Sequence, residues 1–268
     1  MYKAIFCDLD GTLLNDQEKI VSENIEYINK AKENGIKFVI CSGRIKGGFD
    51  SYNKIINISD AIAANGTVVY SDNKITSIDY VNKKDLYEVI EYADKNNLYV
   101  RFFTEDSLYC LNSELEKRVI SHNYRNTSSI DINQAYKLAD ENIVVKLGFF
   151  NDHEKLLIIK DELNNSLENL ECVFSGERYL DVVIKGINKG EGIKKFCKTN
   201  NIDINDTIGI GDEENDFPML NTVGLACCPK NARDAVKKIC GYVSNKDNNN
   251  GAVGDIIKNV CFNNKYLI

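Results

Sequence analysis

Two patterns of hydrophobic and polar positions divide this chain into parts. Toward both ends of the sequence, short apolar runs stop at glycine, serine or aspartate, which predicts buried β-strands at residues 3–7, 36–41, 61–64, 67–70 and 207–211. After the first run, Ile25, Ile28 and Ala31 recur at helical spacing. We expect this helix to begin with Ser22 as its N-cap and to end at Gly35. A strand, a helix and a strand joined in this way predict parallel strands whose carboxyl ends share one edge, where ligands bind in such sheets.

The middle of the chain, from about residue 83, has a different pattern. Its apolar runs come in adjacent pairs, which predicts hairpin-like strands at residues 98–103, 108–111, 143–150, 172–174 and 179–184. Helices are expected at residues 85–97, 113–121 and 153–167, and a polar connection is expected at 123–142. Paired strands with helices indicate an α+β module. We therefore expect residues 83–186 to be an inserted domain, with residues 1–82 and 187–268 forming the core.

The end of the chain returns to the first pattern. An amphipathic helix is expected from Lys189 through Ile193 and Phe196. The remaining elements are expected to be strands at 223–227 and 242–243, a helix at 232–239 and a loop at 247–251. The predicted fold class is α/β, with a Rossmann-like parallel sheet as the core and an inserted α+β domain.

Two aspartates directly follow the first strand. In an extended backbone, Asp8 and Asp10 at positions i and i+2 point the same way. Gly11 then permits a turn or a close approach that a side chain would block, and Thr12 adds a hydroxyl group. Paired carboxylates beside such a turn suit a hard cation such as Mg²⁺, and either is able to act as a nucleophile. An acidic turn after a strand is the alternative interpretation.

Two further stretches suit the binding of an anion. Ser42, Gly43 and Arg44 follow the second strand, where a hydroxyl and freely oriented backbone N–H groups are able to hold a phosphate. A small loop with a capping serine is the alternative. Lys189 stands at the start of a helix, where its charge opposes the helix dipole. Its placement is explained if it holds an anion or an attacking aspartate, and a solvated surface lysine is the alternative.

A final acidic stretch follows the strand at 207–211. Asp212 comes at the end of this strand, on the same edge as Asp8 if the sheet is parallel. Asn215 and Asp216 are expected on the first turn of the helix that follows. Acidic residues at a helix start are ordinary capping, which accounts for Glu213, for Glu214 and in part for Asp216. Capping does not account for Asp212.

Composition and charge exclude several classes of function. The net charge of −7 and the pI near 5.1 argue against a nucleic-acid-binding surface, which needs clustered Lys and Arg. No apolar run approaches the roughly 20 residues that span a bilayer, and the first residues do not resemble a signal peptide. We therefore expect a cytoplasmic protein without a membrane partner. Nine cysteines without CxxC spacing are expected to be free thiols.

The residue inventory narrows the chemistry further. His122 and His153 are the only histidines, so a histidine-rich metal site is excluded and a Ser-His-Asp arrangement is disfavoured. No GxxxxGK[ST] motif occurs, which argues against a P-loop kinase. Carboxylates, a serine and a lysine are left to carry the chemistry.

Taken together, four stretches in this order resemble the motifs of the haloacid dehalogenase superfamily of phosphatases. They are Asp8-Leu-Asp10-Gly-Thr12, Ser42 after the second strand, Lys189, and Gly211-Asp212-x-x-Asn215-Asp216. The module between Ser42 and Lys189 is similar to the type IIB cap of the Cof-like subgroup. Where that subgroup usually shows Ala-Met-Gly-Asn-Ala, this chain has Ala226-Cys-Cys-Pro-Lys-Asn231-Ala232, which changes the loop but keeps Asn231 in register.

The resemblance implies a Mg²⁺-dependent phosphatase. Asp8 would attack phosphorus to form an aspartyl-phosphate, while Asp10 would protonate the leaving oxygen and later deprotonate water. Mg²⁺ would be held by Asp8, the main-chain carbonyl of Asp10 and Asp212, with Asp216 as a ligand or a neighbour of the ligands. Chemically, this would divide one difficult displacement into two easier ones.

The resemblance also implies how the substrate is held. Ser42, Gly43, Asn215 and Lys189 would bind the phosphate, and Lys189 would neutralise the charge that builds there. The inserted domain would close over this edge and read the leaving group. The implied substrate is a sugar phosphate or another small phosphomonoester.

Specificity residues and rival activities stay open from the sequence. Arg44, Arg101, Arg178 and Asp181 are candidates for contacting the substrate, with surface or hinge roles as the alternative. A phosphotransferase or phosphomutase would use the same residues but pass the phosphoryl group to a sugar hydroxyl. A non-catalytic binding protein on the same scaffold is the second rival, and an oligomeric state is not implied.

Overall fold

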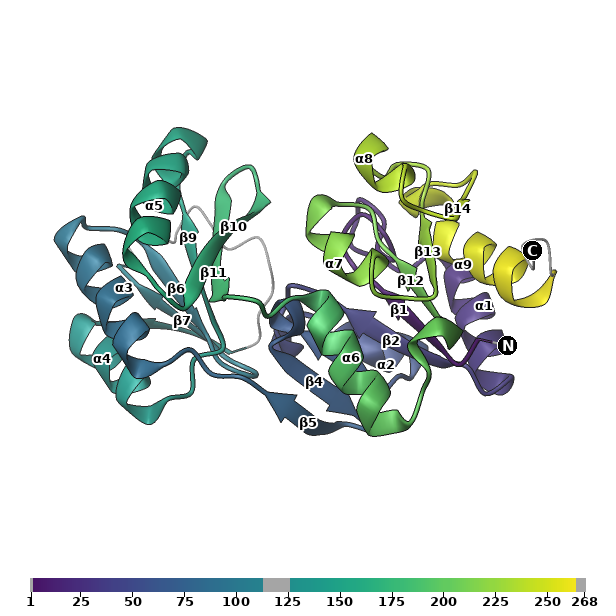
Figure 1. The fold of residues 1–268 in the computed structure, drawn as a ribbon, viewed down its shortest axis with the longest axis horizontal. Helices are drawn as coiled ribbons and strands as arrows, with labels where there is room; N and C mark the ends of the chain where they lie inside the picture. Colours follow the sequence, from purple (N-terminus) through teal and green to yellow (C-terminus); the bar gives the residue numbers. More distant parts are fainter. Residues whose placement is uncertain (1, 113–125, 264–268) are drawn as a thin grey trace. The chain divides into compact units, whose positions relative to one another are not determined.

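The computed structural model describes residues 2–112 and 126–263, and the helix expected at 113–121 lies outside them. The chain folds into two compact units, each made of separate segments (Figure 1). Unit 1 comprises Met1–Ser42, Ser51–Ser77 and Asn188–Ile268, and unit 2 comprises Gly43–Asp50 and Ile78–Ile187. The short segment Gly43–Asp50 thus groups with the middle of the chain, although it lies far before residue 83 in the sequence.

Unit 1 is built on an eight-stranded sheet in the order β14-β13-β12-β1-β2-β3-β4-β5. Pairing is parallel from β14 through to β3, and β3 and β4 form an antiparallel pair. Its strands are β1 (Ala4–Cys7), β2 (Lys37–Cys41), β3 (Ala61–Ala63), β4 (Val68–Ser71), β5 (Lys74–Ile78), β12 (Thr207–Ile210), β13 (Leu225–Cys228) and β14 (Tyr242–Val243). The predicted fold class, a parallel α/β core, is confirmed.

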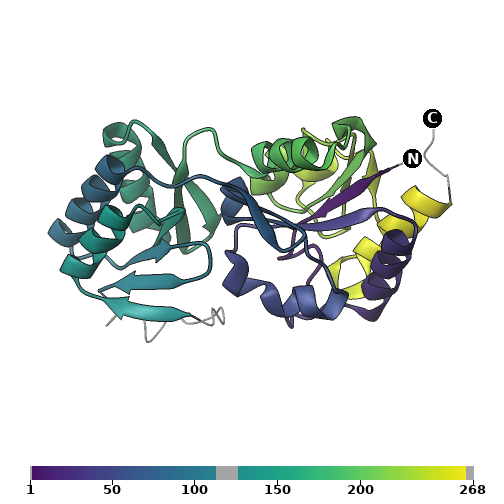
Figure 2. The ribbon, with the colours of Figure 1, turned by 90° about the horizontal axis from the view of Figure 1, so that it is seen from below.

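Helices cover both faces of this sheet (Figure 2). One face carries α1 (Ser22–Glu33), α2 (Asp50–Ile56) and α9 (Ala252–Ile257), and the other carries α6 (Lys189–Asn200), α7 (Phe217–Leu220) and α8 (Asp234–Lys237). Alternate residues of β1 face opposite sides, so Ala4 and Phe6 join the core beneath α6. The Phe6 ring packs edge-on against Phe196 of α6, with ring centroids 5.6 Å apart. Asp8, the next residue in this alternation, comes to the amino end of α6.

The start of α1 differs from the prediction by one residue. Val21, not Ser22, is the N-cap, and no side chain caps the first turn. Ser22 is instead the first helical residue, since Val21 is the last with extended backbone angles. The end of the helix is as expected, because Gly35 has a φ of 76° directly after the C-cap residue.

Unit 2 contains a six-stranded sheet in the order β10-β11-β9-β6-β7-β8. The pairs are antiparallel except β7 with β8, and the helices lie on one side of the sheet (Figures 1 and 2). Its elements are α3 (Lys83–Lys95), β6 (Val100–Phe103), β7 (Leu108–Leu111), β8 (Thr127–Ile130), α4 (Ile132–Glu141), β9 (Lys146–Phe150), α5 (His153–Ser166), β10 (Leu170–Gly176) and β11 (Tyr179–Ile184).

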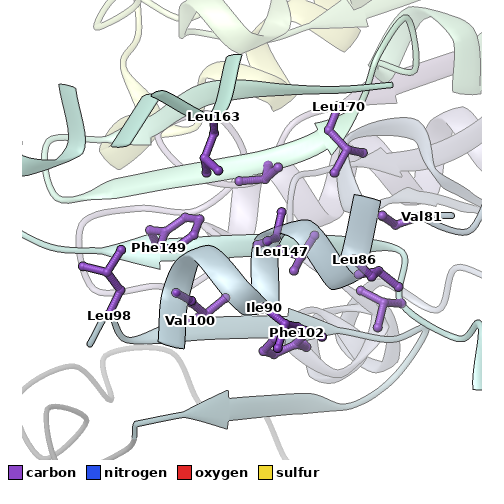
Figure 3. Packing of buried hydrophobic residues seen from close by; sticks show 14 of the residues in the cluster. Val81, Leu86, Ile90, Leu98, Val100, Phe102, Leu147, Phe149, Leu163 and Leu170 are labelled. Atoms are coloured by element: carbon purple, nitrogen blue, oxygen red, sulfur yellow. The ribbon is translucent and has the colours of Figure 1, made fainter. Parts of the chain in front are cut away.

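The core of unit 2 lies between its helices and its sheet. Leu86 and Ile90 of α3 and Leu163 of α5 meet Val100 and Leu147 of the sheet (Figure 3). Strand residues alternate between the two faces, so only every second residue of β6, β9 and β11 enters this core. The intervening residues of these strands therefore project from the opposite face.

The polar connection expected at 123–142 is wrong where the structure describes it. Residues 127–130 form β8, which pairs with β7, and residues 132–141 form α4. Asp131 caps this helix, because its side chain accepts the backbone N–H of Gln134 while Gln134 accepts the backbone N–H of Asp131. Ala135 and Leu138 bury a narrow apolar face three residues apart, which the polar residues around them conceal in the sequence.

No helix within the described ranges is both long enough and apolar enough to cross a membrane.

Candidate active site

Three strands of unit 1 end beside one another and deliver the candidate residues. β1 lies between β12 and β2, and all three run parallel. The backbone N–H of Asp8 donates to the carbonyl of Ile210 at 2.9 Å, so pairing with β12 continues to Asp8. Asp212 follows β12, and Ser42 follows β2. The structure thus brings the strand-end residues to one edge, as the sequence predicts for parallel strands.

Lys189 links two of the aspartates. It is the first residue of α6, and only 1% of it is exposed. Its Nζ donates to Asp8 Oδ1 at 2.5 Å and to Asp216 Oδ1 at 2.6 Å. Asn188 caps the same helix by accepting the backbone N–H of Glu191. A buried ammonium against the helix dipole is stable here because two carboxylates surround it.

Asp216 is fully buried, and both of its carboxylate oxygens are engaged. Oδ1 accepts from Lys189, while Oδ2 accepts the backbone N–H of Asp212 at 2.9 Å and that of Glu213 at 3.2 Å. It lies in the 3₁₀ turn Glu214–Asp216 that precedes α7. Asp216 therefore holds the loop after β12 and orients Lys189 at the same time.

Thr12 and Gly11 fix the position of Asp212. The buried Thr12 hydroxyl donates to Asp212 Oδ1 at 2.6 Å. Gly11 has a φ of 77°, and a Cβ at this position would overlap the Asp212 carboxylate. Glycine is thus required here both for the backbone conformation and for the close approach of Asp212.

The cluster of Asp8, Asp212, Asp216 and Lys189 carries more negative than positive charge. Burial raises the pKa of Asp8 well above its usual range, with Asp216 and Asp212 adding to the rise and the Lys189 ammonium opposing it. Burial likewise raises the pKa of Asp212 to about 7, although the Thr12 hydroxyl lowers it. The pKa of Lys189 is raised, because Asp216 and Asp8 outweigh its burial. Three carboxylates against one ammonium leave a formal charge of −2 when all are ionised.

A divalent metal ion fits this donor set. Asp8, Asp212 and Asp216 are all buried, and one carboxylate oxygen from each lies within 4.8 Å of the others. Hard cations such as Mg²⁺ take carboxylate oxygens as ligands, and +2 matches the excess charge. Asp8 and Asp212 each use only one oxygen in the side-chain hydrogen bonds of the described part, whereas Asp216 uses both. Asp8 and Asp212 are therefore better placed than Asp216 to bind such an ion.

Asp10 does not belong to the strand. The extended backbone expected through Asp10 ends at Cys7, because three backbone N–H groups, those of residues 12–14, turn back to the carbonyl of Leu9. Asp10 is exposed while Asp8 is buried. Only Leu9 separates the two residues in the chain, and the charge of Asp10 adds to the rise in the pKa of Asp8 that burial causes. Asp10 is thus close to Asp8 and open to solvent, although not by strand geometry.

The residues expected to hold phosphate are placed unequally. Ser42 is buried, its backbone N–H donates to Ile62 and its carbonyl accepts from Asn65. Gly43 groups with unit 2, where its carbonyl accepts from Lys146 Nζ at 3.0 Å. Asn215 is half-buried in the turn beside Asp216.

Two site residues were given no role by the sequence. Thr12 was noted only as a hydroxyl, but it binds Asp212. Asn231 Nδ2 donates to the carbonyl of Gly11 at 2.8 Å, and its Oδ1 accepts the backbone N–H of Asn248. The loop at Pro229 and Lys230 therefore still delivers an asparagine to the turn after β1. Its position in register was the only sequence signal.

Comparison with known proteins identifies the family of this chain. The family model described as haloacid dehalogenase-like hydrolase matches residues 5–257. The chain is 28% identical to Phosphatase YwpJ of Bacillus subtilis, over 93% of this chain and 96% of the relative. It is 26% identical to 5-amino-6-(5-phospho-D-ribitylamino)uracil phosphatase YwtE of the same species, over 93% and 95%.

Solved structures agree on the fold. The HAD subclass IIB sugar phosphatase BT4131 superimposes with a TM-score of 0.84 at 22% identity, covering 97% of this chain and 99% of that one. The chain belongs to the haloacid dehalogenase-like hydrolase family, Cof-like subgroup, and is a phosphoric monoester hydrolase.

Proposed function

We propose that this protein is a Mg²⁺-dependent phosphatase that hydrolyses small phosphomonoesters through an aspartyl-phosphate on Asp8. The observation that carries the proposal is the buried Lys189, which contacts both Asp8 and Asp216 beside Asp212. Such a cluster is costly to bury and is explained if it binds an ion and an anionic group. The roles given below to individual residues belong to this proposal.

In the first step, a carboxylate oxygen of Asp8 forms a bond to phosphorus as the bond from phosphorus to the ester oxygen breaks. Asp10 gives its proton to the departing oxygen, so the leaving group departs as an alcohol. Asp8 must be ionised to attack. The Lys189 ammonium favours this state because its charge lowers the pKa that burial raises.

In the second step, the ionised Asp10 takes a proton from water as the water oxygen attacks phosphorus. The bond between Asp8 and phosphorus breaks, inorganic phosphate leaves, and both aspartates return to their starting states. The exposure of Asp10 suits this exchange with water and substrate. Ser42, Gly43, Asn215 and Lys189 would hold the non-reacting phosphate oxygens.

Asp8, Asp212 and the main-chain carbonyl of Asp10 would hold Mg²⁺, and Asp216 would position Lys189 and the loop after β12. When bound, the ion supplies positive charge that reduces repulsion between the carboxylates and the substrate phosphate. The surplus of two negative charges in the described cluster supports this assignment.

A sugar phosphate or similar metabolite is the proposed substrate class. One relative is named for a phosphoribityl substrate, and one structural neighbour is described as a sugar phosphatase. We propose that unit 2, which has its own core, carries the specificity for the leaving group.

The test is phosphate release from an aryl phosphate and a panel of sugar phosphates, with and without Mg²⁺. We expect metal-dependent turnover in the wild type and a loss of at least about 10³-fold in Asp8→Asn. Asp234→Asn is the matched control, because Asp234 is an exposed aspartate of the same unit that pairs with Lys237. It should retain wild-type turnover.

Two outcomes would count against the proposal. Equal activity in Asp8→Asn and wild type would remove Asp8 as the nucleophile. If the folded wild type transferred phosphoryl groups to an added sugar without releasing phosphate, the protein would be a phosphotransferase instead.

A further inference from the structure

Three consecutive strands of unit 2 present a row of unusual residues on the face opposite its helices. Arg101 of β6 is in register with Gly148 of β9, and Gly148 is in register with Asp181 of β11. Their neighbours Val100, Phe102, Leu147, Phe149, Leu180 and Val182 enter the core with the helices. By strand alternation, the row therefore lies on the other face.

Arg101 is buried, and its Nε–H donates no hydrogen bond to any described residue. Only 8% of the residue is exposed, and Nε finds no acceptor within the described structure. Its guanidinium lies over the rings of Phe103 and Tyr179, with the central carbon 5.3 and 4.9 Å from the ring centroids. Ring contacts of this kind recover only part of the cost of removing a guanidinium from water. Stability alone therefore does not explain this arginine.

Two charged residues next to Arg101 on this face pair with each other. Lys146 Nζ donates to Asp181 Oδ2 at 2.9 Å, and both side chains are almost completely buried. Asp181 is thus neutralised by Lys146, so within the described structure the Arg101 guanidinium is left as surplus positive charge in this row, without an ion pair. An anion is the ligand that this surplus calls for.

Gly148 leaves space between the charged groups. A Cβ on Gly148 would lie 3.5 Å from Arg101 Nη2 and 3.5 Å from Asp181 Oδ1. It would also lie 3.3 Å from Cε2 of Phe103, which is tighter than ordinary contact. Any other residue would fill the space that lies beside the guanidinium.

The same cluster is tied to the proposed phosphate site through the chain. Lys146 Nζ also donates to the carbonyl of Gly43, at 3.0 Å. Gly43 directly follows Ser42, which is proposed to hold the transferring phosphate. The Lys146–Asp181 pair thus contacts the residue that directly follows Ser42 in the chain.

We propose that Arg101 is the centre of an anion subsite in unit 2 that binds an acidic group of the leaving group, either a carboxylate or a second phosphate. This inference rests on the proposed phosphatase function and adds a class of substrate to it. The Lys146–Asp181 ion pair fixes the side chains beside the Arg101 guanidinium. The absence of a side chain at Gly148 leaves room for the acidic oxygens of the ligand. Phosphomonoesters with a second negative group are the favoured substrates.

The test compares substrates that differ only in that group. 3-Phosphoglycerate is matched with glycerol 3-phosphate for a carboxylate, and fructose 1,6-bisphosphate is matched with fructose 1-phosphate for a second phosphate. We expect wild-type kcat/KM to favour the acidic member of at least one pair by about tenfold or more. Arg101→Met should lower kcat/KM for that member by about 10- to 100-fold and for its neutral partner less than about twofold, as for a hydrogen bond to a charged group. The pair that responds identifies the acidic group.

Matched variants separate binding from folding. Lys137→Met is the control, because Lys137 is an exposed cation of α4 in the same unit that pairs with Glu141. It should keep the wild-type preference. The melting temperature of Arg101→Met should be unchanged or higher, since the variant removes a buried charge that forms no ion pair with the described residues. If this variant does not fold, Gly148→Ala and Arg101→Lys take its place, and both should weaken the preference for the acidic substrate.

Equal kcat/KM for the acidic and neutral members of both pairs in wild type would overturn the subsite. Equal losses on all four substrates in Arg101→Met would do the same. Calorimetric titration of 3-phosphoglycerate and fructose 1,6-bisphosphate into Asp8→Asn protein, with and without Arg101→Met, reports binding without turnover. If this binding depends on Arg101 but the wild type releases no phosphate from any substrate, the proposed function is rejected and the subsite is retained. If both compounds bind equally well with and without Arg101, the subsite is rejected.

Discussion

Replacing Lys189 by methionine removes the only ammonium in direct contact with the buried aspartate cluster of the described structure. Methionine has a similar length and no charge, so the change tests charge with little change of volume. Asp8 and Asp216 would each lose a hydrogen bond of 2.6 Å or less, while Asp212 would remain beside them. The site would then hold three carboxylates without a counter-charge.

The expected cost is large because the group is almost completely buried. Removing one partner of a buried ion pair typically costs about 3–5 kcal/mol, and here two carboxylates share the partner. Lys194 of the same helix is the matched control. It forms an exposed pair with Glu191 at 2.6 Å, and exposed pairs contribute at most about 1 kcal/mol. We expect Lys194→Met to lower the free energy of unfolding by at most about 1 kcal/mol.

The stability that Lys189→Met loses should increase as pH rises. Burial raises the pKa of Asp8 in the native state, and the Lys189 charge opposes that rise. Without Lys189, the native Asp8 pKa is higher still, so the native state binds more protons than the unfolded state above the ordinary aspartate pKa. Stability of metal-free Lys189→Met should therefore fall as pH rises from about 5 to about 8, more steeply than that of wild type.

The measurement is urea unfolding of metal-free wild type, Lys189→Met and Lys194→Met at pH 5.5 and pH 8. A second series contains Mg²⁺. Because the ion restores positive charge, it should reduce the difference in unfolding free energy between Lys189→Met and wild type. If Lys189→Met at pH 8 without metal is as stable as Lys194→Met, the reasoning about buried charge is wrong. If the difference in unfolding free energy between Lys189→Met and wild type is as large at pH 5.5 as at pH 8, Asp8 does not take up a proton as argued. That result would leave the argument about buried charge intact.

Three other replacements test the turn after β1. Thr12→Val should weaken Mg²⁺ binding by about 10- to 100-fold in calorimetric titration, because Asp212 loses the hydroxyl that orients it, and Thr12→Ser should restore most of the affinity. Gly11→Ala should cost clearly more unfolding free energy than Gly35→Ala, since both have φ near 77° but only at Gly11 does the new Cβ meet Asp212; equal losses of about 1 kcal/mol would show that backbone strain alone matters. Asp10→Asn should lower kcat by about 10²- to 10⁴-fold and flatten its pH profile, and an unchanged profile in rapid steady-state assays would remove Asp10 as the acid and base.

The sequence predicted those features that depend on a local pattern of residues or on the rules of parallel strand pairing. The strands at 108–111 and 179–184 have the predicted bounds, because polar residues flank each mostly apolar run on both sides. The strand-end aspartates could be placed on one edge because parallel pairing requires it. A contact between Lys189 and an aspartate was one of the explanations that the sequence allowed for a lysine at the start of a helix.

Other features depend on partners far away in the chain. The helix Ile132–Glu141 was missed because its buried face is only a few residues wide and acquires meaning from the α3 side chains against it. The helix Ala252–Ile257 was not predicted, because it is short and its glycine at 254 is required by close packing on Glu23 of α1. The exposed side chain of Asp10 follows from a turn held by the Leu9 carbonyl, which side-chain pattern does not encode. Arg101 could be named as a candidate, but its burial depends on strand register.

The position of β1 in the middle of the sheet has a consequence for how the protein is made. β2 follows β1 closely in the sequence, but β12 begins only at Thr207, and Asp8 precedes its partner Lys189 by 181 residues. At about 5–20 residues per second, a ribosome needs roughly 10–40 s to synthesise that length. During this time one edge of β1 has no native partner, and unpaired strand edges favour aggregation. Unit 2, whose core comes entirely from the intervening residues, is complete before β12 leaves the ribosome. Asp8 is therefore synthesised long before Lys189, Asp212 and Asp216, and the site forms only after these residues have been added.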